Sequence, residues 1–485
     1  MAAQLPSIQD SPPSHKELFY NGQWHAPLSK EYRETFNPGN GSVIDQVAQA
    51  GARDVDAAVE AAHQAFAGWR STPPAQRAAY LRKAADVIRQ HAEQLALLDA
   101  LNTGNPVAEM LSDAKVAAAN LDYFAGLTPM VRGETIPQSD DSFHYTLREP
   151  LGVVARIIAF NHPAMFAGAK MAALLAAGNT VIIKPPDQAP LSCLRLAEIL
   201  SDVFPPGVLN ILPEGVECGK ALSTHPLVSK VTLIGSVPTG KAIQRAAADT
   251  LKPTLCEYRQ TGQGVARGMN FTWAGQSCGS TSRVFLHESH HDEVLRRVRD
   301  YVRTHFKPGV PTDPSTTMGP VISKAVQERV LSYIESAKQE GAELLLGGKA
   351  PTGIPEIEGG YFVEPTIFAN VQPHMRIARE EIFGPVMSVF KWTDEDEVIR
   401  QVNDTRYGLT AAIYTQSMAT AHRTVPKIET GFIWVNQVGN HFLGIPFGGF
   451  KESGSGRRSV WTSCCRLRRR SVSMLACGDA ADMQR

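Results

Sequence analysis

A single cysteine among small residues is the strongest candidate for covalent chemistry in this sequence. Cys278 lies in the segment 275–280, Gly-Gln-Ser-Cys-Gly-Ser, whose small side chains let the backbone bend and let a bound group come close. A thiol exposed in such a turn acts as a nucleophile when its thiolate is stabilised. The alternative is a buried structural cysteine, which is the more common role for a cysteine taken alone. The surrounding sequence has to decide between these two roles.

Two polar residues that end predicted strands could complete such a site. Asn161 follows a predicted strand at 153–160, and a side-chain amide at a strand end can donate a hydrogen bond to a developing oxyanion. An ordinary turn asparagine is the alternative. Glu257 belongs to the end of a predicted strand at 254–258, where a carboxylate can act as a general base for water. The ends of strands are therefore the positions that matter most for function.

Two further strand ends carry residue types that suit a nucleotide. Lys184 and Asp187 follow a predicted strand and could hold ribose hydroxyls, with a chance ion pair in an exposed loop as the alternative. The segment 235–240, Gly-Ser-Val-Pro-Thr-Gly, ends another strand and opens a helix. Gly235 and Gly240 would let backbone N–H groups approach a pyrophosphate there. The segment does not match G-x-G-x-x-G, so taken alone it is a weak signal.

Alternating strands and helices would position all of these residues. Within residues 151–258, short apolar strands alternate with helices, which indicates a parallel sheet with helices on both faces. Ligands of such sheets bind beyond the carboxyl ends of the strands. A second α/β unit follows Cys278. The predicted strands are 153–160, 180–183, 208–212, 230–234 and 254–258 in the first unit and 284–287, 361–371, 386–392, 409–415 and 432–435 in the second, and the predicted helices include 165–177, 191–203 and 395–402.

The N-terminal region is expected to be an extended arm followed by two helices. Residues 1–40 show no helical periodicity and contain a short predicted hairpin at 19–24. Apolar residues recur at helical spacing from Val55 to Trp69. A second helix opens at Thr72 with two prolines in its first turn.

The composition is typical of a globular protein, with no net charge and no membrane-spanning segment. The 485 residues suffice for two or three domains, and 48 basic residues balance 48 acidic ones, so nothing favours nucleic acid or a membrane as partner. There is no apolar run long enough to cross a bilayer, and the N-terminus does not read as a signal peptide. The seven cysteines show no disulfide or zinc spacing. We therefore expect a cytoplasmic protein without a metal site.

Six segments, taken together and in this order, resemble the aldehyde dehydrogenase superfamily. The resemblance runs from residue 18 to residue 457, which is nearly the whole chain. It implies an α/β fold with two parallel-sheet domains and a small oligomerisation extension. It also implies an NAD(P)-dependent oxidoreductase that acts on a small-molecule aldehyde. The segments are 176–185, 235–240, 275–278, 380–385, 434–436 and 446–451.

The resemblance assigns a catalytic role to each of the three candidates. Cys278 matches the nucleophile of the family, which forms a thiohemiacetal with the aldehyde and then a thioester. Asn161 matches the amide that forms the oxyanion hole with the Cys278 backbone N–H. Glu257 matches the general base that activates water, because residues 255–257 occupy the place of the family's Leu-Glu-Leu segment.

The cofactor contacts are implied in the same way. Lys184 and Asp187 match the contacts to the adenosine ribose, and Ser236 matches a contact to the pyrophosphate. Glu381 and Phe383 match the contacts on the nicotinamide side, although a turn that starts a strand is the ordinary explanation of their segment. A carboxylate at Asp187 repels a 2′-phosphate and favours NAD, but it is shorter than the glutamate common there and leaves NADP open.

The resemblance also implies a domain organisation. An oligomerisation hairpin at 136–149 would interrupt the cofactor domain and would join a homo-oligomer. The implied boundaries are 1–135 and 150–257 for the NAD-binding domain, 258–440 for the catalytic domain and 441–485 for the C-terminal segment.

Two places depart from the family pattern. The segment 258–267 replaces a longer stretch, so the interval from Glu257 to Cys278 is shorter than usual by roughly a dozen residues. After residue 457 the chain becomes basic, where the family has an acidic helix and a final strand. Residues 458–465 can be encoded by codons that give the acidic family sequence in another reading frame, which indicates a frameshift. We expect weakened oligomer assembly and, as the alternative function, an impaired relative or a faulty gene model that still binds NAD.

Overall fold

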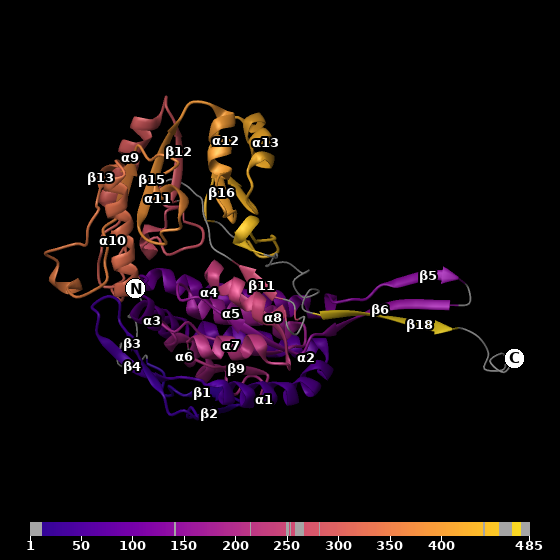
Figure 1. The fold of residues 1–485 in the computed structure, drawn as a ribbon. Coiled ribbons are helices and arrows are strands. Elements are labelled where there is room, and N and C mark those ends of the chain that lie inside the picture. Colours follow the sequence, from indigo (N-terminus) through magenta and orange to yellow (C-terminus); the bar gives the residue numbers. More distant parts are fainter. Residues whose placement is uncertain are drawn as a thin grey trace, which may run out of the picture.

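The computed structural model describes residues 12–139, 142–213, 215–248, 252, 254–257, 266–280, 282–439, 442–454 and 468–476. Two α/β units lie one above the other, and a three-stranded arm extends away from them (Figure 1). The units are tied together by backbone hydrogen bonds, for example from Tyr361 N–H to the carbonyl oxygen of Pro38 at 2.9 Å.

A seven-stranded sheet forms the core of the first unit. Its strand order is β11-β10-β7-β8-β9-β1-β2, and β7 to β11 run parallel. Because β8 and β9 lie on one side of β7 while β10 and β11 lie on the other, the strand order reverses between β7 and β10. The strands are β1 (Leu18–Tyr20), β2 (Gln23–His25), β7 (Val153–Ile157), β8 (Thr180–Lys184), β9 (Leu209–Ile211), β10 (Val228–Ile234) and β11 (Thr254–Glu257).

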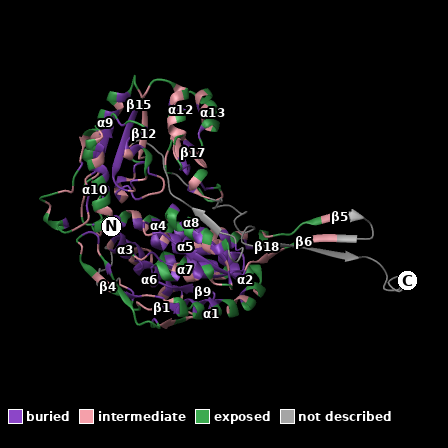
Figure 2. Cartoon of the chain, viewed as in Figure 1, coloured by how far each residue is buried: buried purple, intermediate pink, exposed green. Residues whose placement is uncertain are grey.

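Helices cover both faces of this sheet, which explains why β7, β8 and β9 are buried at every position. Val153 and Ala155 of β7 pack into the cluster under one group of helices, whereas Val154 packs into the cluster under the other. Figure 2 shows these strands buried between exposed helical surfaces. The first group is α1 (Ala52–Ser71), α7 (Val216–Thr224) and α8 (Val237–Ala248), and the second is α2 (Pro74–Gln90), α3 (Ala92–Thr103), α4 (Val107–Leu127), α5 (Pro163–Ala176) and α6 (Leu191–Leu200).

The second unit contains two separate sheets. A four-stranded sheet has the order β12-β15-β14-β13, and, within the residues that the structure describes, β16 pairs in parallel with β17 alone. The apolar clusters place α9 on one face of the larger sheet and α10 and α11 on the other. The elements are β12 (Arg283–His287), α9 (His291–His305), α10 (Lys324–Gln339), β13 (Glu343–Leu346), β14 (Thr366–Ala369), α11 (Arg376–Arg379), β15 (Val386–Trp392), α12 (Glu395–Asn403), β16 (Thr410–Ile413), α13 (Met418–Thr424) and β17 (Phe432–Val435).

The arm consists of β5 (Thr135–Ser139), β6 (Ser142–Pro150) and β18 (Arg468–Ala476). Its first two strands lie where the sequence predicts a hairpin. β18 belongs to the basic C-terminal segment, for which no element was expected, and it pairs with β6 from Arg468↔Pro150 to Ala476↔Ser142. Residues 455–467 and 477–485, which hold the rest of that segment, lie outside the described residues.

Several predicted elements need correction. Four long helices, and not two, precede the arm, because His91 and Gly104 end helices that periodicity alone does not separate. The predicted strand at 361–371 is only Thr366–Ala369, since Pro365 has no N–H to donate. The N-terminal arm holds a further hairpin of β3 (Tyr32–Phe36) and β4 (Val43–Ala48), and β1 joins the large sheet through Phe19↔Ile211. Among the helices of the described residues, none has the length and apolarity needed to span a bilayer.

Candidate active site

The candidate residues gather at one edge of the seven-stranded sheet. β8, β7, β10 and β11 are neighbours and run parallel, so the segments that follow them meet at their common carboxyl edge. These segments hold Asn161 and Ser236, while Lys184 is the last residue of β8 and Glu257 is the last residue of β11, paired with Ile234 of β10. The reversal of strand order between β7 and β10 lies at this edge, and such a switch point is where open α/β sheets bind ligands.

Cys278 lies in a tightly hydrogen-bonded loop of the second unit. The loop follows the short 3-10 helix Phe271–Trp273. The hydroxyl of Ser280 donates to the carbonyl oxygen of Gly275, and the buried Gln276 accepts a 3.0 Å hydrogen bond from the backbone N–H of Ile322. The Cys278 side chain is only half-buried and forms no disulfide. The loop is thus fixed while its thiol stays accessible.

The other cysteines with described side chains are unsuited to this role. Cys193 and Cys218 are completely buried in the two apolar clusters of the first unit. Burial raises the pKa of the Cys193 thiol well above its ordinary value, and the negative charge of Asp99 adds to the shift. A buried, protonated thiol is inert, so Cys278 is the nucleophile candidate within the described part of the chain.

Three contacts bring the cysteine loop, the Asn161 turn and the segment 381–385 together. The rings of Phe160 and Phe383 meet edge to face with centroids 5.9 Å apart. The ring of His162 meets Trp273 edge to face at 4.8 Å. A Cβ at Gly275, whose φ is +69°, would overlap the carbonyl oxygen of Gly384. The three segments therefore form one continuous wall.

Buried polar side chains from α3 and α4 hold the Asn161 turn from behind. Asn105, in the connection between these helices, donates a 2.7 Å hydrogen bond from Nδ2 to the backbone carbonyl of Asn161. Asp113 forms a 2.6 Å contact with Nδ1 of His162. Asp99 accepts a 3.2 Å hydrogen bond from the backbone N–H of Ala164, at the start of α5. The turn is consequently fixed at three of four consecutive positions.

Two acidic side chains near this turn, Asp99 and Glu109, have raised pKa values. The pKa of Asp99 is raised to about 7, chiefly by burial and also by the nearby carboxylate of Asp113, while the Ser192 hydroxyl and the Ala164 N–H oppose the rise. Burial also raises the pKa of Glu109, again with a contribution from Asp113. Desolvation disfavours the charged carboxylate in both cases. Asp99 therefore titrates near neutral pH, directly behind the Asn161 turn.

The nucleotide candidates lie along the same edge. Lys184 Nζ contacts Asp187 Oδ1 at 2.6 Å, so the two predicted ribose contacts form a partly buried ion pair with each other. The hydroxyl of Ser236 is exposed and lies 2.8 Å from that of Thr239. α8 begins at the next residue, and the N-terminus of a helix attracts phosphate groups. Gly240 is buried within the first turn of α8.

The sequence-derived candidates fall into three groups in the structure. The segments that carry Asn161, Cys278 and Phe383 adjoin one another, and the half-buried Glu381 lies near Tyr407, whose pKa is raised first by burial and further by Glu381. Lys184, Asp187, Gly235, Ser236 and Gly240 line the neighbouring strand ends. Glu257 is placed by its backbone at this edge, and its side chain lies outside the described residues.

Sequence reasoning missed the residues that support the site. Asp113 belongs to a helix that was not predicted, Asn105 lies in the connection before that helix, and Trp273 is five positions before Cys278 without a recognisable motif. One signal was available, because Asp99 and Asn102 interrupt the otherwise apolar run 95–102. Polar residues at helical positions that should be buried indicate specific hydrogen bonds.

Known proteins match this chain over most of its length. The sequence model of the aldehyde dehydrogenase family matches residues 24–466, and the match runs past residue 457, where the resemblance described above ends. Aldehyde dehydrogenase tropH of Talaromyces stipitatus is 58% identical over 477 residues, which cover 94% of this chain and 92% of that relative.

Solved structures of aldehyde dehydrogenases have the same fold as this chain. An aldehyde dehydrogenase from Bacillus cereus in complex with NAD+ matches with a TM-score of 0.92 and 36% identity, over 98% of this chain and 99% of that one. Betaine aldehyde dehydrogenase from Staphylococcus aureus in complex with NAD+ matches with a TM-score of 0.92 and 32% identity, over 96% and 95% of the two chains. The predicted α/β fold class is thereby confirmed. The chain belongs to the aldehyde dehydrogenase family, as its six sequence segments predicted.

Proposed function

We propose that this chain oxidises an aldehyde to its carboxylic acid with NAD+, through a covalent intermediate on Cys278. The observation that carries the proposal is the wall formed by the cysteine loop, the Asn161 turn and the segment 381–385. This wall stands at the carboxyl edge of the sheet, where open α/β sheets bind their ligands. Membership of the aldehyde dehydrogenase family supports the choice of aldehyde as substrate.

The strand ends suit a dinucleotide. Lys184 and Asp187 would hold the adenosine ribose, Ser236 and the N-terminus of α8 would hold the pyrophosphate, and Glu381 with Phe383 would bound the nicotinamide side. The exposed hydroxyl of Ser236 immediately before α8 supports the fit, since helix N-termini favour phosphate. The two solved relatives in complex with NAD+ support the same cofactor. Bound NAD+ supplies the acceptor for the aldehyde hydride.

The protein residues would act in two half-reactions. The Cys278 thiolate attacks the carbonyl carbon, while the Asn161 amide and the Cys278 backbone N–H stabilise the resulting oxyanion. Loss of hydride from that carbon leaves a thioester on Cys278. Glu257 then removes a proton from water, which attacks the thioester and releases the acid and the free thiolate. Overall, aldehyde, NAD+ and water give carboxylic acid, NADH and a proton.

The proposal also includes oligomeric assembly and a cytoplasmic location. The arm of β5, β6 and β18 extends away from both units, where it can contact a second copy of the chain (Figure 1). We infer a homo-oligomer built through this arm and weakened by the altered C-terminal segment. The scattered cysteines suit the reducing cytoplasm.

Aldehyde-dependent NADH formation tests the proposal. The wild-type protein should reduce NAD+ with simple aliphatic or aromatic aldehydes, and Cys278→Ala should abolish the reaction. Cys218→Ala is the matched control, because it removes a completely buried thiol of the apolar core. Substantial turnover by Cys278→Ala would refute the assignment. Absence of turnover in the wild type, together with NAD+ binding in a calorimetric titration, would identify the chain as an impaired relative.

A further inference from the structure

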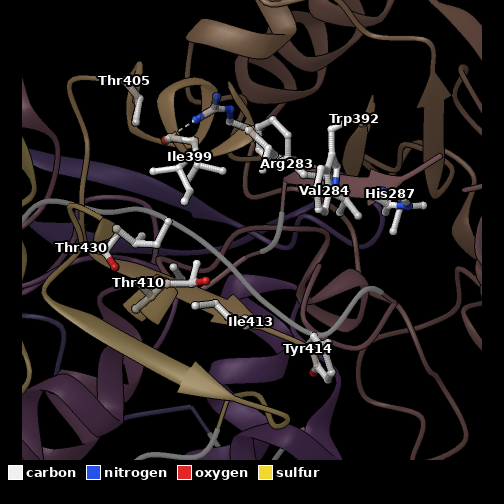
Figure 3. Close-up of a pocket in the computed structure, with 18 of the residues that line it drawn as sticks. Arg283, Val284, His287, Trp392, Ile399, Thr405, Thr410, Ile413, Tyr414 and Thr430 are labelled. Carbon is white, nitrogen blue, oxygen red and sulfur yellow. Dashed lines mark hydrogen bonds between the residues drawn. The ribbon is translucent and has the colours of Figure 1, made fainter. Parts of the chain in front are cut away.

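A large cavity in the second unit is distinct from the candidate active site. Its volume is about 570 Å3, and it opens between the four-stranded sheet and the β16–β17 pair (Figure 3). The lining includes the consecutive residues 283–287 and 409–414 together with apolar residues of α12. Its described lining residues include none of the candidate catalytic or cofactor residues.

The pattern of lining residues shows that the cavity follows strand edges. Successive side chains of a strand point to opposite faces, so a cavity over one face would touch only alternate residues. Here all five residues of β12 and all four residues of β16 line the cavity. The cavity therefore runs along the backbone edges of both strands and not over the face of either sheet.

Both edges are unpaired within the described part of the chain. β12 is the terminal strand of its sheet and pairs with β15 alone, and β16 pairs with β17 alone. Each edge consequently presents a row of backbone N–H and C=O groups toward the same cavity. Unpaired edges of this kind are templates for another strand.

Buried polar atoms around the cavity also lack partners in the described structure. They are Arg283 Nε, Thr410 Oγ1 and Thr430 Oγ1. The guanidinium of Arg283 is already held by Gln401 and Val402, whose carbonyls accept from its two terminal nitrogens. Burial lowers the pKa of Arg283 to about 10, so this group is still charged at neutral pH. Buried polar groups are normally hydrogen-bonded, and three exceptions around one cavity indicate a polar occupant.

We propose that this cavity is a slot for one extended peptide strand supplied by another polypeptide. A strand is the occupant that presents donors and acceptors to both edges at the repeat spacing of a sheet. The basic side chains that line the slot are Arg283, His287 and His290, and its described lining residues include no Asp or Glu. The slot therefore suits a segment with apolar side chains along its length and acidic residues at its ends.

Three synthetic peptides test the slot without reference to dehydrogenase activity. The probe is acetyl-Glu-Val-Thr-Ile-Thr-Val-Glu-amide with a fluorescent label, titrated against the full chain by anisotropy. The first control replaces its central isoleucine with proline, which removes an N–H and prevents strand pairing. The second control replaces both glutamates with lysine. We expect saturable binding of the probe, at least tenfold weaker binding of the proline peptide and intermediate binding of the lysine peptide.

Hydrogen exchange locates the complex. Saturating probe should slow amide exchange in β12 and β16, whereas the proline peptide should not. Ala411→Trp, which fills the slot, should weaken binding of the probe by at least tenfold. If this variant does not fold, the exchange data on the wild-type protein still test the proposal. Equal binding of probe and proline peptide, or unchanged exchange in both strands, would overturn the proposal. Dodecanoate, a small amphiphile, should be tested in the same way. If it slows exchange in β12 and β16 and the probe does not, the slot binds a small amphiphile and the proposal of a peptide strand is overturned.

Discussion

The side-chain amide of Asn105 donates a 2.7 Å hydrogen bond to the backbone carbonyl of Asn161, and both residues are almost completely buried. Asn161 is the proposed oxyanion donor, so Asn105 fixes the backbone on which a catalytic amide depends. Asp113 and Asp99 hold the next positions of the same turn. The support for the proposed chemistry thus comes from helices that carry no candidate catalytic residue.

Asn105→Ala should impair turnover more than it impairs folding. It leaves a buried carbonyl without its donor, which costs about 1–3 kcal/mol of unfolding free energy. A misplacement of about 1 Å in the turn should lower kcat by roughly 10- to 100-fold. Asn210→Ala is the matched control, because it removes a buried amide that donates to the backbone carbonyls of Val181 and Gly207, away from the turn. Equal kcat in the two variants would show that Asn105 is not a positioning residue.

Asp99 should make the stability of the protein depend on pH. Its pKa is raised to about 7 in the folded state, so between pH 4 and 7 the folded protein binds a proton that the unfolded chain has released. The protonated Asp99 therefore contributes up to about 4 kcal/mol to the free energy of unfolding. This contribution is complete below about pH 4 and is lost as the pH rises to 7.

Urea denaturation of wild-type protein and Asp99→Asn measures this effect. The asparagine is isosteric and does not titrate, so the stability of the variant relative to wild type should increase from pH 5 to pH 8. A difference between the two proteins that stays constant over this range would show that Asp99 is ionised throughout.

Asp187 should control the choice between NAD and NADP. Its carboxylate, paired with Lys184, would repel a 2′-phosphate. Asp187→Ser removes the repulsion and releases the Lys184 ammonium to pair with the phosphate, so the KM for NADP should fall by about tenfold or more while that for NAD+ rises. The control Asp202→Ser removes an exposed carboxylate that precedes β9, at the opposite end of the strands. An unchanged cofactor ratio in Asp187→Ser would place the ribose elsewhere.

Glu257→Gln should block the second half-reaction and spare the first. Without its general base, hydrolysis of the thioester should slow by roughly 10²- to 10⁴-fold. Stopped-flow measurements should then show one equivalent of NADH formed in a burst, followed by slow steady-state turnover. Glu217→Gln, on the exposed surface of α7, should behave as wild type. A normal steady-state rate in Glu257→Gln would indicate that the shortened interval before Cys278 has removed Glu257 from the site.

The sequence allowed the fold to be predicted far better than the supports of the site. Apolar runs such as Thr180–Lys184 identify buried parallel strands by themselves, and Asn161 and Cys278 carry recognisable local patterns. The bond from Asn105 to Asn161 joins residues 56 positions apart, and no local pattern encodes such a distance. Likewise, every described strand of the second unit except β13 was predicted individually, whereas the open edges of β12 and β16 depend on how the strands assemble.

Mass spectrometry of trapped acyl-enzyme tests the central claim that Cys278 is the nucleophile. The protein, preferably as Glu257→Gln to slow hydrolysis, is mixed with benzaldehyde and NAD+, quenched in acid and digested. We predict a benzoyl group on the peptide that contains Cys278, formed only when NAD+ is present. A benzoyl group on another residue, or its absence despite NADH formation, would contradict the account.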